Sequence, residues 1–360
     1  MKYLLAIDSF KGCISSVDAN DAVNDAIVAL DSSAKVVTLP VSDGGEGWLD
    51  AFEQCEGGER IYMKAHDPLM RLVDTSYLKI GNKAIIECAK IIGLHLLEPD
   101  ERNPMKTVSY GLGEVIVRAV KDGCNHIVVG LGGSATNDCG VGMLKALGDA
   151  IERLEDEERY LIPENVKFTV ATDVAIPLCG PEGASMLFSR QKGATPEMVK
   201  WLERRSRRFA MYVANKMGYD YSNEPGAGAA GGLGYAFMQW MDAKIVQGAE
   251  LLFDTLKFDE IINDVDLIIT GEGRADRQTL MGKLPCRILR HAMKKNIPVI
   301  LLAGQTENID ELQLAGFHKI ICINPPGTSV SQAIEKPFAI CQLQSTISAL
   351  IQNRLSDFMP

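Results

Sequence analysis

The chain has 360 residues, of which 46% are hydrophobic and 23% charged, and this composition is typical of a globular protein long enough for two domains. Its formal net charge of −10 argues against sequence-independent binding to nucleic acid, which requires a basic face. The nine cysteines include no CxxC pair, and the histidines lack zinc-ligand spacing, so we expect free thiols in a reducing, cytoplasmic setting and no zinc site. No apolar run reaches the length of a membrane span, so neither a membrane partner nor a signal peptide is expected.

Two strand–loop–helix units open the chain. The strands are predicted at Lys2–Ile7 and Lys35–Leu39, and each leads into a loop, DSFKG and then SDGGEG. The first helix begins at Ser15–Ser16 and runs to about Leu30, and the second covers Trp48 to about Gln54. This order is typical of a parallel sheet with helices on its faces.

The pattern changes after Asp67-Pro68. Three strands are predicted in the segment that follows, at Leu72–Ile80, His126–Val129 and Lys167–Ala171, and an apolar run covers Ala84–Ile92. Helices are predicted at Thr107–Lys121, Cys139–Ala150 and Pro196–Met217. We interpret the charge run at Glu152–Arg159 as a solvated helix end or loop. The segment PGAGAAGGLG at Pro225–Gly234 is too rich in glycine for a plain helix.

A basic run stands out within the long helix at Pro196–Met217. Its sequence is RRSRRF, with four arginines at Arg204, Arg205, Arg207 and Arg208. We interpret this run as a solvated helix face and not as a nucleic-acid patch.

The first pattern returns near Phe258. Helices are predicted at Phe258–Asn263, Pro285–Lys294, Ile309–Ala315 and most of Ser331–Leu355, with strands at Asp266–Thr270, Pro298–Leu302 and Lys319–Ile323. The two ends together give five strand–loop–helix units, which predict an α/β protein with a flavodoxin-like doubly wound sheet. We place this domain at residues 1–60 plus 258–360, interrupted by an inserted α/β domain at 61–257.

The segment Gly130–Asp138, GLGGSATND, follows a strand and precedes a helix, which is the arrangement of an anion site. Glycine permits close approach of a ligand to the backbone, and Ser134, Thr136 and Asn137 add side-chain donors. Asp138 could cap the helix or hold a metal ion. The alternative interpretation is an ordinary strand-to-helix turn.

Five loops are expected at one edge of the doubly wound sheet, because the carboxyl ends of parallel strands meet there. They are DSFKG, SDGGEG, TGEGRAD, AGQT and NPPGTS, and they contain Asp8, Lys11, Asp43, Glu46, Glu272, Arg274 and Asp276. Lysine neutralises phosphate charge, carboxylates hold Mg²⁺ and glycine loops cradle phosphate oxygens, so this set of residues indicates phosphoryl transfer. Helix capping and surface exposure are the structural alternatives for each residue taken alone.

Eight ordered motifs resemble the bacterial type I glycerate kinase family across essentially the whole chain. They are DSFKG, SDGGEG, SYGLGE, GLGGSATND, TDV with PL.G, QKGA, PGAGAAGGLG and TGEGRADRQTLMGK. The resemblance implies two α/β domains, one inserted in the other, and Mg²⁺- and ATP-dependent phosphorylation of D-glycerate, most often at the 2-hydroxyl. A 3-phosphoglycerate product, another small hydroxy acid, a dinucleotide-dependent oxidoreductase and a non-catalytic sensor of the same fold are the alternatives.

The resemblance also suggests roles for individual residues. Lys11 and Lys283 would neutralise phosphate charge, Asp43, Glu46 and Asp276 would hold Mg²⁺, Asp8 or Asp173 would orient the glycerate hydroxyl, and Lys192 or Arg274 would pair with the substrate carboxylate. Further substrate or phosphate contacts are expected from Ser9, Gly44, Gly45, Gly132, Gly133, Ser134, Asn137, Asp138, Gly271, Glu272 and Gln278. Trp48, Cys139 and Ile176 depart from the family pattern and put the substrate specificity in question.

Overall fold

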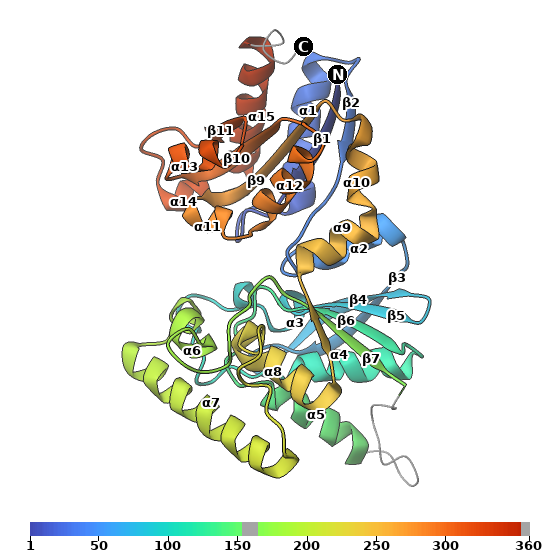
Figure 1. The fold of residues 1–360 in the computed structure, drawn as a ribbon, viewed down its shortest axis with the longest axis vertical. Coiled ribbons are helices and arrows are strands. Elements are labelled where there is room, and N and C mark those ends of the chain that lie inside the picture. The colour runs from blue at the N-terminus through green and yellow to red at the C-terminus, as the bar shows by residue number, and fades with distance from the viewer. Residues whose placement is uncertain (153–164, 354–360) are drawn as a thin grey trace. The chain divides into compact units, whose positions relative to one another are not determined.

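The computed structural model describes residues 1–152 and 165–353, and these residues form two compact units (Figure 1). The first unit contains Met1–Ser42 together with the chain from Leu252 onward, and the second is the continuous segment Asp43–Leu251. Among the helices of the described residues, none combines the length and apolarity that a membrane crossing requires.

The first unit is built on a five-stranded parallel sheet of order β11-β10-β9-β1-β2. Its strands are β1 (Lys2–Ile7), β2 (Lys35–Thr38), β9 (Leu267–Ala275), β10 (Val299–Thr306) and β11 (Lys319–Cys322). In chain order this is 2-1-3-4-5, so the flavodoxin-like doubly wound sheet predicted from the sequence is confirmed.

Helices cover this sheet. They are α1 (Ser16–Leu30), α10 (Phe258–Ile261), α11 (Arg277–Leu280), α12 (Leu284–Met293), α13 (Ile309–Leu314), α14 (Val330–Ala333) and α15 (Lys336–Asn353). Helices α1 and α15 share one hydrophobic cluster with Leu5 and Ile7 of β1, whereas the alternating residues Leu4 and Ala6 are buried on the other face. Both faces of the parallel sheet are therefore buried, which explains the continuous apolar runs in its strands.

The second unit has a six-stranded mixed sheet of order β3-β4-β5-β6-β7-β8. Its strands are β3 (Glu59–His66), β4 (Leu72–Ile80), β5 (Lys83–Glu87), β6 (His126–Gly130), β7 (Lys167–Ala171) and β8 (Lys244–Val246). The β3–β4 and β4–β5 pairs are antiparallel, and β5 to β8 are parallel. Strands β3 and β8 were not predicted, and both are largely exposed or half-buried along their length.

The helices of the second unit are α2 (Trp48–Glu56), α3 (Ala89–Ile92), α4 (Tyr110–Lys121), α5 (Val141–Glu152), α6 (Ala184–Phe188), α7 (Pro196–Met217), α8 (Ala229–Met241) and the start of α9 (Gly248–Leu256), with short 3₁₀ turns at η1 (Leu94–Leu96) and η2 (Arg190–Lys192). Apolar residues of α4, α5 and α8 form the main core with strands β5 to β7. Apart from its first residue, which ends α5, the predicted charge run at Glu152–Arg159 lies outside the described residues, as does the end of the predicted C-terminal helix.

The first crossing between the compact units lies at Ser42–Asp43, earlier than the expected position near residue 60. The reason is α2, which packs against β4 and β5 of the second unit. The full side chain of Trp48 is buried there, and its ring meets that of Phe52 at a centroid distance of 4.7 Å. Strand β2 and helix α2, which the sequence pattern joined into one unit, thus belong to different compact units.

Candidate functional site

Two glycine loops meet in the second unit, SDGGEG before α2 and GLGGSATND after β6. The amide of Gly132 donates a hydrogen bond of 2.9 Å to the carbonyl of Gly44. A Cβ atom on Gly132 would lie 2.4 Å from the Cα of Gly45, and one on Gly130 would lie 2.5 Å from the Gly44 carbonyl oxygen. Packing of one backbone directly on the other therefore requires these glycines. Residues Asp43–Gly47 of SDGGEG belong to the second unit, whereas the other four predicted loops belong to the first.

Glu87 fixes the end of the SDGGEG loop through hydrogen bonds to the backbone at the start of α2. It is the last residue of β5 and only 1% exposed, and its carboxylate accepts hydrogen bonds from the amides of Leu49 (3.0 Å) and Gly47 (3.4 Å). These amides open α2, whose N-cap Gly47 has no side chain to satisfy them. Burial raises the pKa of Glu87 to about 7. Sequence reasoning missed this residue, although a carboxylate inside the predicted apolar run Ala84–Ile92 was the signal available.

Asp138 caps two helices. Its Oδ2 accepts hydrogen bonds from the amide and the hydroxyl of Ser109, just before α4, and from the amide of Gly142 in α5. Its Oδ1 accepts from the amide of Gly140. Four donors therefore occupy this carboxylate, and of its two expected roles the structure supports the cap.

A buried lysine lies under the same loop. Lys192 of η2 is 3% exposed, and its Nζ donates to the Ser134 hydroxyl (3.1 Å) and the Thr136 carbonyl (2.7 Å). Among the described residues no carboxylate pairs with it, and burial lowers its pKa to about 8. Asp138 is close enough to favour the charged form of Lys192 but forms no direct ion pair with it, so an anion could still bind beside this buried ammonium group.

Polar groups of the loop itself are also buried. Thr136 and Asn137 are fully buried, and Thr136 Oγ1 and Asn137 Oδ1 have no hydrogen-bond partner among the described residues. The Asn137 amide donates to the Ser185 hydroxyl (3.0 Å), and Arg205 of α7 donates to the Asn137 carbonyl. Two cations, Lys192 and Arg205, therefore fix the backbone of this loop.

The PGAGAAGGLG segment supports the loop from another side. Ala230, Gly231 and Gly232 within α8 have positive φ values of 51°, 69° and 96°, so this segment is not a regular helix, as its composition predicted. The carbonyl of Gly231 accepts from the amide of Cys139, and a Cβ atom on Gly231 would lie 2.1 Å from the Thr136 carbonyl oxygen. Only glycine allows this approach.

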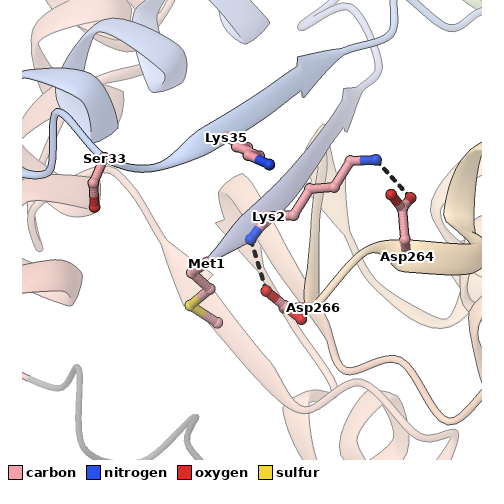
Figure 2. Close-up of a pocket in the computed structure, with 6 residues that line it drawn as sticks. All are labelled: Met1, Lys2, Ser33, Lys35, Asp264 and Asp266. Carbon is pink, nitrogen blue, oxygen red and sulfur yellow. Dashed lines mark hydrogen bonds and ion pairs between the residues drawn. The ribbon is translucent and has the colours of Figure 1, made fainter.

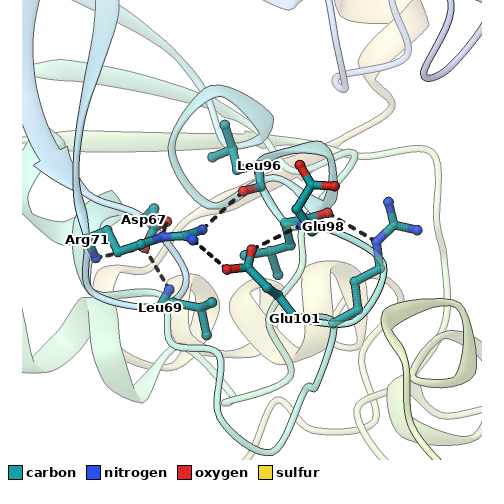
Figure 3. A network of polar contacts seen from close by, with 8 residues as sticks. Asp67, Leu69, Arg71, Leu96, Glu98 and Glu101 are labelled. Carbon is teal, nitrogen blue, oxygen red and sulfur yellow. Dashed lines mark hydrogen bonds and ion pairs between the residues drawn. The ribbon is translucent and has the colours of Figure 1, made fainter.

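A network of polar contacts connects the loop between β3 and β4 with the segment between η1 and α4 (Figure 3). The guanidinium group of Arg71 donates to Asp67 (2.6 Å), Glu101 (2.7 Å) and the carbonyl of Leu96 (3.2 Å). Leu96 ends η1, a turn whose Leu94 amide donates to the Gly133 carbonyl, and Gly93 forms a β-bridge with Ser134. The network thus holds the turn η1, which contacts the GLGGSATND loop.

The remaining site residues of the second unit follow the same edge of its sheet. Asp173 comes two residues after β7, whose last residue Ala171 pairs with Gly130. Asp43 Oδ1 accepts from the amide of Gly45 (3.2 Å), and Glu46 Oε1 lies 3.6 Å from Nδ1 of His95 in η1. The structure therefore brings Asp43, Glu46, Ser134 and Lys192 into one group of loops at the carboxyl ends of parallel strands.

In the first unit, two of the predicted loops are strand extensions. Gly271, Glu272 and Arg274 belong to β9, which pairs with β10 as far as Ala275. Gly271 pairs with Leu302 of β10, and a Cβ atom on Gly271 would lie 2.7 Å from the Leu302 carbonyl oxygen. This glycine therefore allows close strand pairing, where the sequence suggested a turn. The AGQT segment likewise belongs to β10.

The charged residues of these extensions, Glu272 and Arg274, pair with residues just beyond the strands. Glu272 is 6% exposed and accepts from Thr279 Oγ1 (2.6 Å) and Lys283 Nζ (2.9 Å), although burial still raises its pKa. Arg274 pairs with Asp276 (3.1 Å) and Glu307 (2.8 Å).

Asp276 has a second role, as the N-cap of α11. Its Oδ1 accepts from the amide of Gln278 (2.8 Å). The carboxylate is therefore engaged by a cap and by an arginine.

The loop DSFKG follows β1 in the first unit. Asp8 is 8% exposed, its amide donates to the Gly271 carbonyl, and its Oδ1 accepts from the amide of Ser9 (2.7 Å). Lys11 is exposed in the turn that follows. Seven predicted site residues of the first unit therefore lie near the ends of β1 and β9 or in the segments that follow these strands. They are Asp8, Ser9, Lys11, Glu272, Asp276, Gln278 and Lys283.

A surface pocket of the first unit lies at the opposite edge of this sheet (Figure 2). Its lining includes Lys2 and Lys35, which begin β1 and β2, and Asp266, which precedes β9. Lys2 pairs with Asp264 (2.5 Å), and its amide donates to Asp266 (2.7 Å). This pocket lies at the amino ends of the strands and holds no predicted site residue.

Within the described residues no group of three or more His, Cys, Asp or Glu side chains is arranged to hold a metal ion. All nine cysteines are free thiols, as expected. Of the three departures from the family pattern, Trp48 is a core residue of the second unit, and Cys139 adopts a positive φ of 55°, a conformation that favours glycine. Ile176 is half-buried beside Gly228, whose amide donates to its carbonyl.

Comparison with known proteins identifies the family. The model of the glycerate kinase family matches residues 3–352. The chain is 33% identical to glycerate 2-kinase of Escherichia coli K12 over 373 residues, covering 98% of each chain, and 34% identical to glycerate kinase of Bacillus subtilis 168 over 358 residues, covering 93% of each. The crystal structure of a putative glycerate kinase 2 from Salmonella typhimurium LT2 matches with a TM-score of 0.76, 33% identity and 98% coverage of each chain. The chain belongs to the glycerate kinase family of phosphotransferases.

Proposed function

We propose that this protein transfers the γ-phosphoryl group of ATP to the 2-hydroxyl of D-glycerate, giving 2-phosphoglycerate and ADP in the cytoplasm. Membership of the family and the name of the Escherichia coli relative, glycerate 2-kinase, support this proposal. The observation that carries it furthest is the buried ammonium group of Lys192 beside the Ser134 hydroxyl, because a small hydroxy acid offers a carboxylate and a hydroxyl to such a pair.

We assign the substrate carboxylate to Lys192 in preference to Arg274. Arg274 is already neutralised by Asp276 and Glu307, and its side chain is half exposed, so a substrate anion would have to displace two carboxylates. Lys192 is buried, and within the part of the chain that the structure describes its ammonium group donates to a hydroxyl and a carbonyl group and forms no ion pair. An anion beside Lys192 would therefore gain more than one beside Arg274.

Asp43 and Glu46 are the residues proposed to hold Mg²⁺. They supply carboxylate oxygens from one loop, the donor type that Mg²⁺ prefers, and Mg²⁺ commonly takes one or two carboxylates together with phosphate oxygens and water. Asp276 is a weaker candidate because its carboxylate caps α11 and pairs with Arg274. When bound, Mg²⁺ neutralises charge on the transferred phosphoryl group.

Lys11 and Lys283 are proposed to neutralise phosphate charge, and Asp8 or Asp173 to orient the hydroxyl and accept its proton. A loose transition state demands little of a base, so positioning dominates. Lys11→Ala should lower turnover by orders of magnitude while the melting temperature stays unchanged. Asp8→Asn and Asp173→Asn, compared in the same assay, identify the orienting carboxylate as the one whose loss reduces kcat with an intact fold.

A coupled ADP-release assay over small hydroxy acids tests the proposal, with phosphorus NMR of the product to locate the phosphoryl group. We expect D-glycerate to be the preferred acceptor and the product phosphorus to couple to the proton on C2. Coupling to the C3 protons would correct the regiochemistry. Stabilisation of the protein by D-glycerate and Mg-ATP without ADP release would instead indicate a sensor of the same fold.

A further inference from the structure

The basic run of α7 forms a small pocket whose function the kinase chemistry does not explain. Trp201, Arg204, Arg205 and Arg208 line a surface pocket of about 360 Å³ in the second unit. They occupy positions i, i+3, i+4 and i+7 of the helix, so they share one face. The pocket thus combines three guanidinium groups with one indole ring.

Two of these arginines lack an ion-pair partner in the described part of the chain. Among the described residues neither Arg204 nor Arg208 forms an ion pair, whereas Arg207, on the neighbouring face, pairs with Glu203 at 2.8 Å. Like charges four residues apart destabilise a helix, and here they stand in a chain of net charge −10. An anion from solution would relieve this repulsion.

The third arginine links the pocket to the candidate site. The Arg205 guanidinium lies over the Trp201 ring, 5.0 Å from its centre, and its Nη2 donates to the Asn137 carbonyl. Asn137 belongs to the GLGGSATND loop that Lys192 also contacts through Thr136. One side chain therefore contacts both the pocket and the loop.

We propose that the α7 pocket binds a phosphomonoester dianion, and that Arg205 couples its occupancy to the GLGGSATND loop. The planar fork of a guanidinium group matches phosphate oxygens, and Trp201 provides a flat apolar wall for the organic part. The pocket spans about two helical turns and the rest of the chain is acidic, so a small anion fits it better than a nucleic acid. Binding does not depend on the proposed kinase activity, whereas the effect on turnover does.

Fluorine NMR of protein labelled with 5-fluorotryptophan tests the binding. The three tryptophans give three resonances, and Trp201→Phe assigns the one that reports on the pocket. The probe is inorganic phosphate, titrated at constant ionic strength with chloride as the balancing ion. We expect a saturable shift of the Trp201 resonance in wild type that weakens about tenfold or more in the double variant Arg204→Gln/Arg208→Gln.

Arg207→Gln is the matched control, because it removes an arginine of the same helix that already has a carboxylate partner. It should leave the phosphate affinity within about twofold of wild type. A Trp201 shift that is absent, or that persists unchanged in the double variant, overturns the site. A larger response to a single-stranded oligonucleotide or to vesicles of anionic lipid than to phosphate overturns its assignment to a small ligand.

The coupling to the loop is measured separately. Phosphate also competes at a kinase active site, so its effect on the KM for glycerate is compared between wild type and the double variant, with all else equal. A phosphate effect that differs at least twofold between them supports the coupling, and identical effects overturn it while leaving the binding result intact. Failure of both proteins to phosphorylate glycerate would instead count against the proposed function.

Discussion

Lys192 is a buried, charged residue whose ammonium group forms no direct ion pair with a carboxylate of the described residues. In the second unit its ammonium group is held by a hydroxyl and a carbonyl oxygen, which are weaker partners than a carboxylate. Burial disfavours the charged form of this side chain and lowers its pKa to about 8 from an ordinary value of 10.5. A residue placed at such a cost is a candidate for function rather than for stability.

Lys192→Met tests this role in two independent ways. If the charge binds substrate, the variant should lose about 10²-fold in kcat/KM for glycerate, and the wild-type value should fall as the pH rises above 8. The exposed Lys200→Met serves as the control and should retain wild-type kinetics.

Because the folded-state pKa of Lys192 is depressed, the native state releases its proton before the unfolded state does, between pH 8 and 10.5. The free energy of unfolding of wild type, relative to Lys192→Met, should therefore rise across this window, as measured by urea denaturation.

Glu87 supports a second prediction at the level of a single side chain. Its two oxygens accept from two different amides, and glutamine offers only one acceptor, so Glu87→Gln should lower the free energy of unfolding by about 1–3 kcal/mol at pH 5. The exposed Glu98→Gln should change it little.

The pH dependence of Glu87 has the opposite sign to that of an ordinary paired carboxylate. Burial raises its folded-state pKa to about 7, so its contribution is fully present below its unfolded pKa of 4.5 and is lost as the pH rises through 7. Urea denaturation of wild type and Glu87→Gln at pH 5 and pH 8 measures this contribution. An equal difference between the two proteins at both pH values would contradict the assignment.

At the scale of elements, the glycine-rich start of α8 acts as a support for the GLGGSATND loop. Gly231→Ala and Gly218→Ala separate this role from the general cost of a left-handed residue. Both glycines have positive φ, 69° and 79°, and each alanine should cost about 1 kcal/mol for that reason alone. Gly218 ends α7 and a Cβ atom there meets nothing within 4 Å, whereas one on Gly231 meets the Thr136 carbonyl oxygen at 2.1 Å.

Gly231→Ala must therefore displace the backbone that Lys192 and Arg205 hold. We expect it to lower the free energy of unfolding by clearly more than Gly218→Ala does and to reduce kcat, whereas Gly218→Ala leaves kcat unchanged. Thermal unfolding and the ADP-release assay measure the two effects. Equal losses of stability in the two variants would show that the contact with Thr136 has no consequence.

Elements with strong periodicity were predicted from the sequence to within a residue or two. Strands β1, β4 and β7 and helix α7 begin and end where the hydrophobic pattern and the flanking residues place them, since Thr195 caps α7 and Gly218 terminates it. The GEGRA segment was assigned to a loop because its glycines resemble a turn, but pairing with β10 keeps it in β9. Propensity carries no information about such tertiary pairing.

The candidate site was predictable only in part, for a related reason. Motif residues such as Asp43, Ser134 and Lys192 stand out in the sequence, whereas Glu87, the partners of Asp138 and the link from Arg205 to Asn137 depend on contacts between distant segments. A single sequence specifies which residues can bind phosphate or metal. Which of them are consumed by caps and ion pairs becomes visible only when the chain is folded.

At the scale of the whole molecule, the chain is divided into two units that each bury their own apolar residues. The core of the second unit contains residues of β5 to β7, α4, α5 and α8, and that of the first contains residues of β1, β9, β10, α1 and α15. The second unit is a continuous segment, and the first is assembled from both ends of the chain. The position of the first crossing decides which unit contains α2 and the two amide groups at its start that donate hydrogen bonds to the Glu87 carboxylate.

This division predicts the behaviour of two fragments that differ only at their ends. The fragment of residues 43–251 retains α2, so Trp48 stays buried and the Glu87 carboxylate keeps its two amide donors. The fragment 61–257, bounded as the sequence pattern suggested, lacks α2 and exposes the face of β4 and β5 on which that helix packs. We therefore expect the first fragment to unfold cooperatively in urea with a blue-shifted Trp48 emission that Trp48→Phe removes.

The second fragment should unfold at lower urea concentration or fail to unfold cooperatively, because the Glu87 carboxylate has lost its two amide donors and the apolar face under α2 is uncovered. Circular dichroism followed through the same urea series compares the two directly. Greater stability of residues 61–257 than of 43–251 would contradict the placement of α2 in the second unit. It would also remove the reason for which Glu87 is assigned to hold the SDGGEG loop.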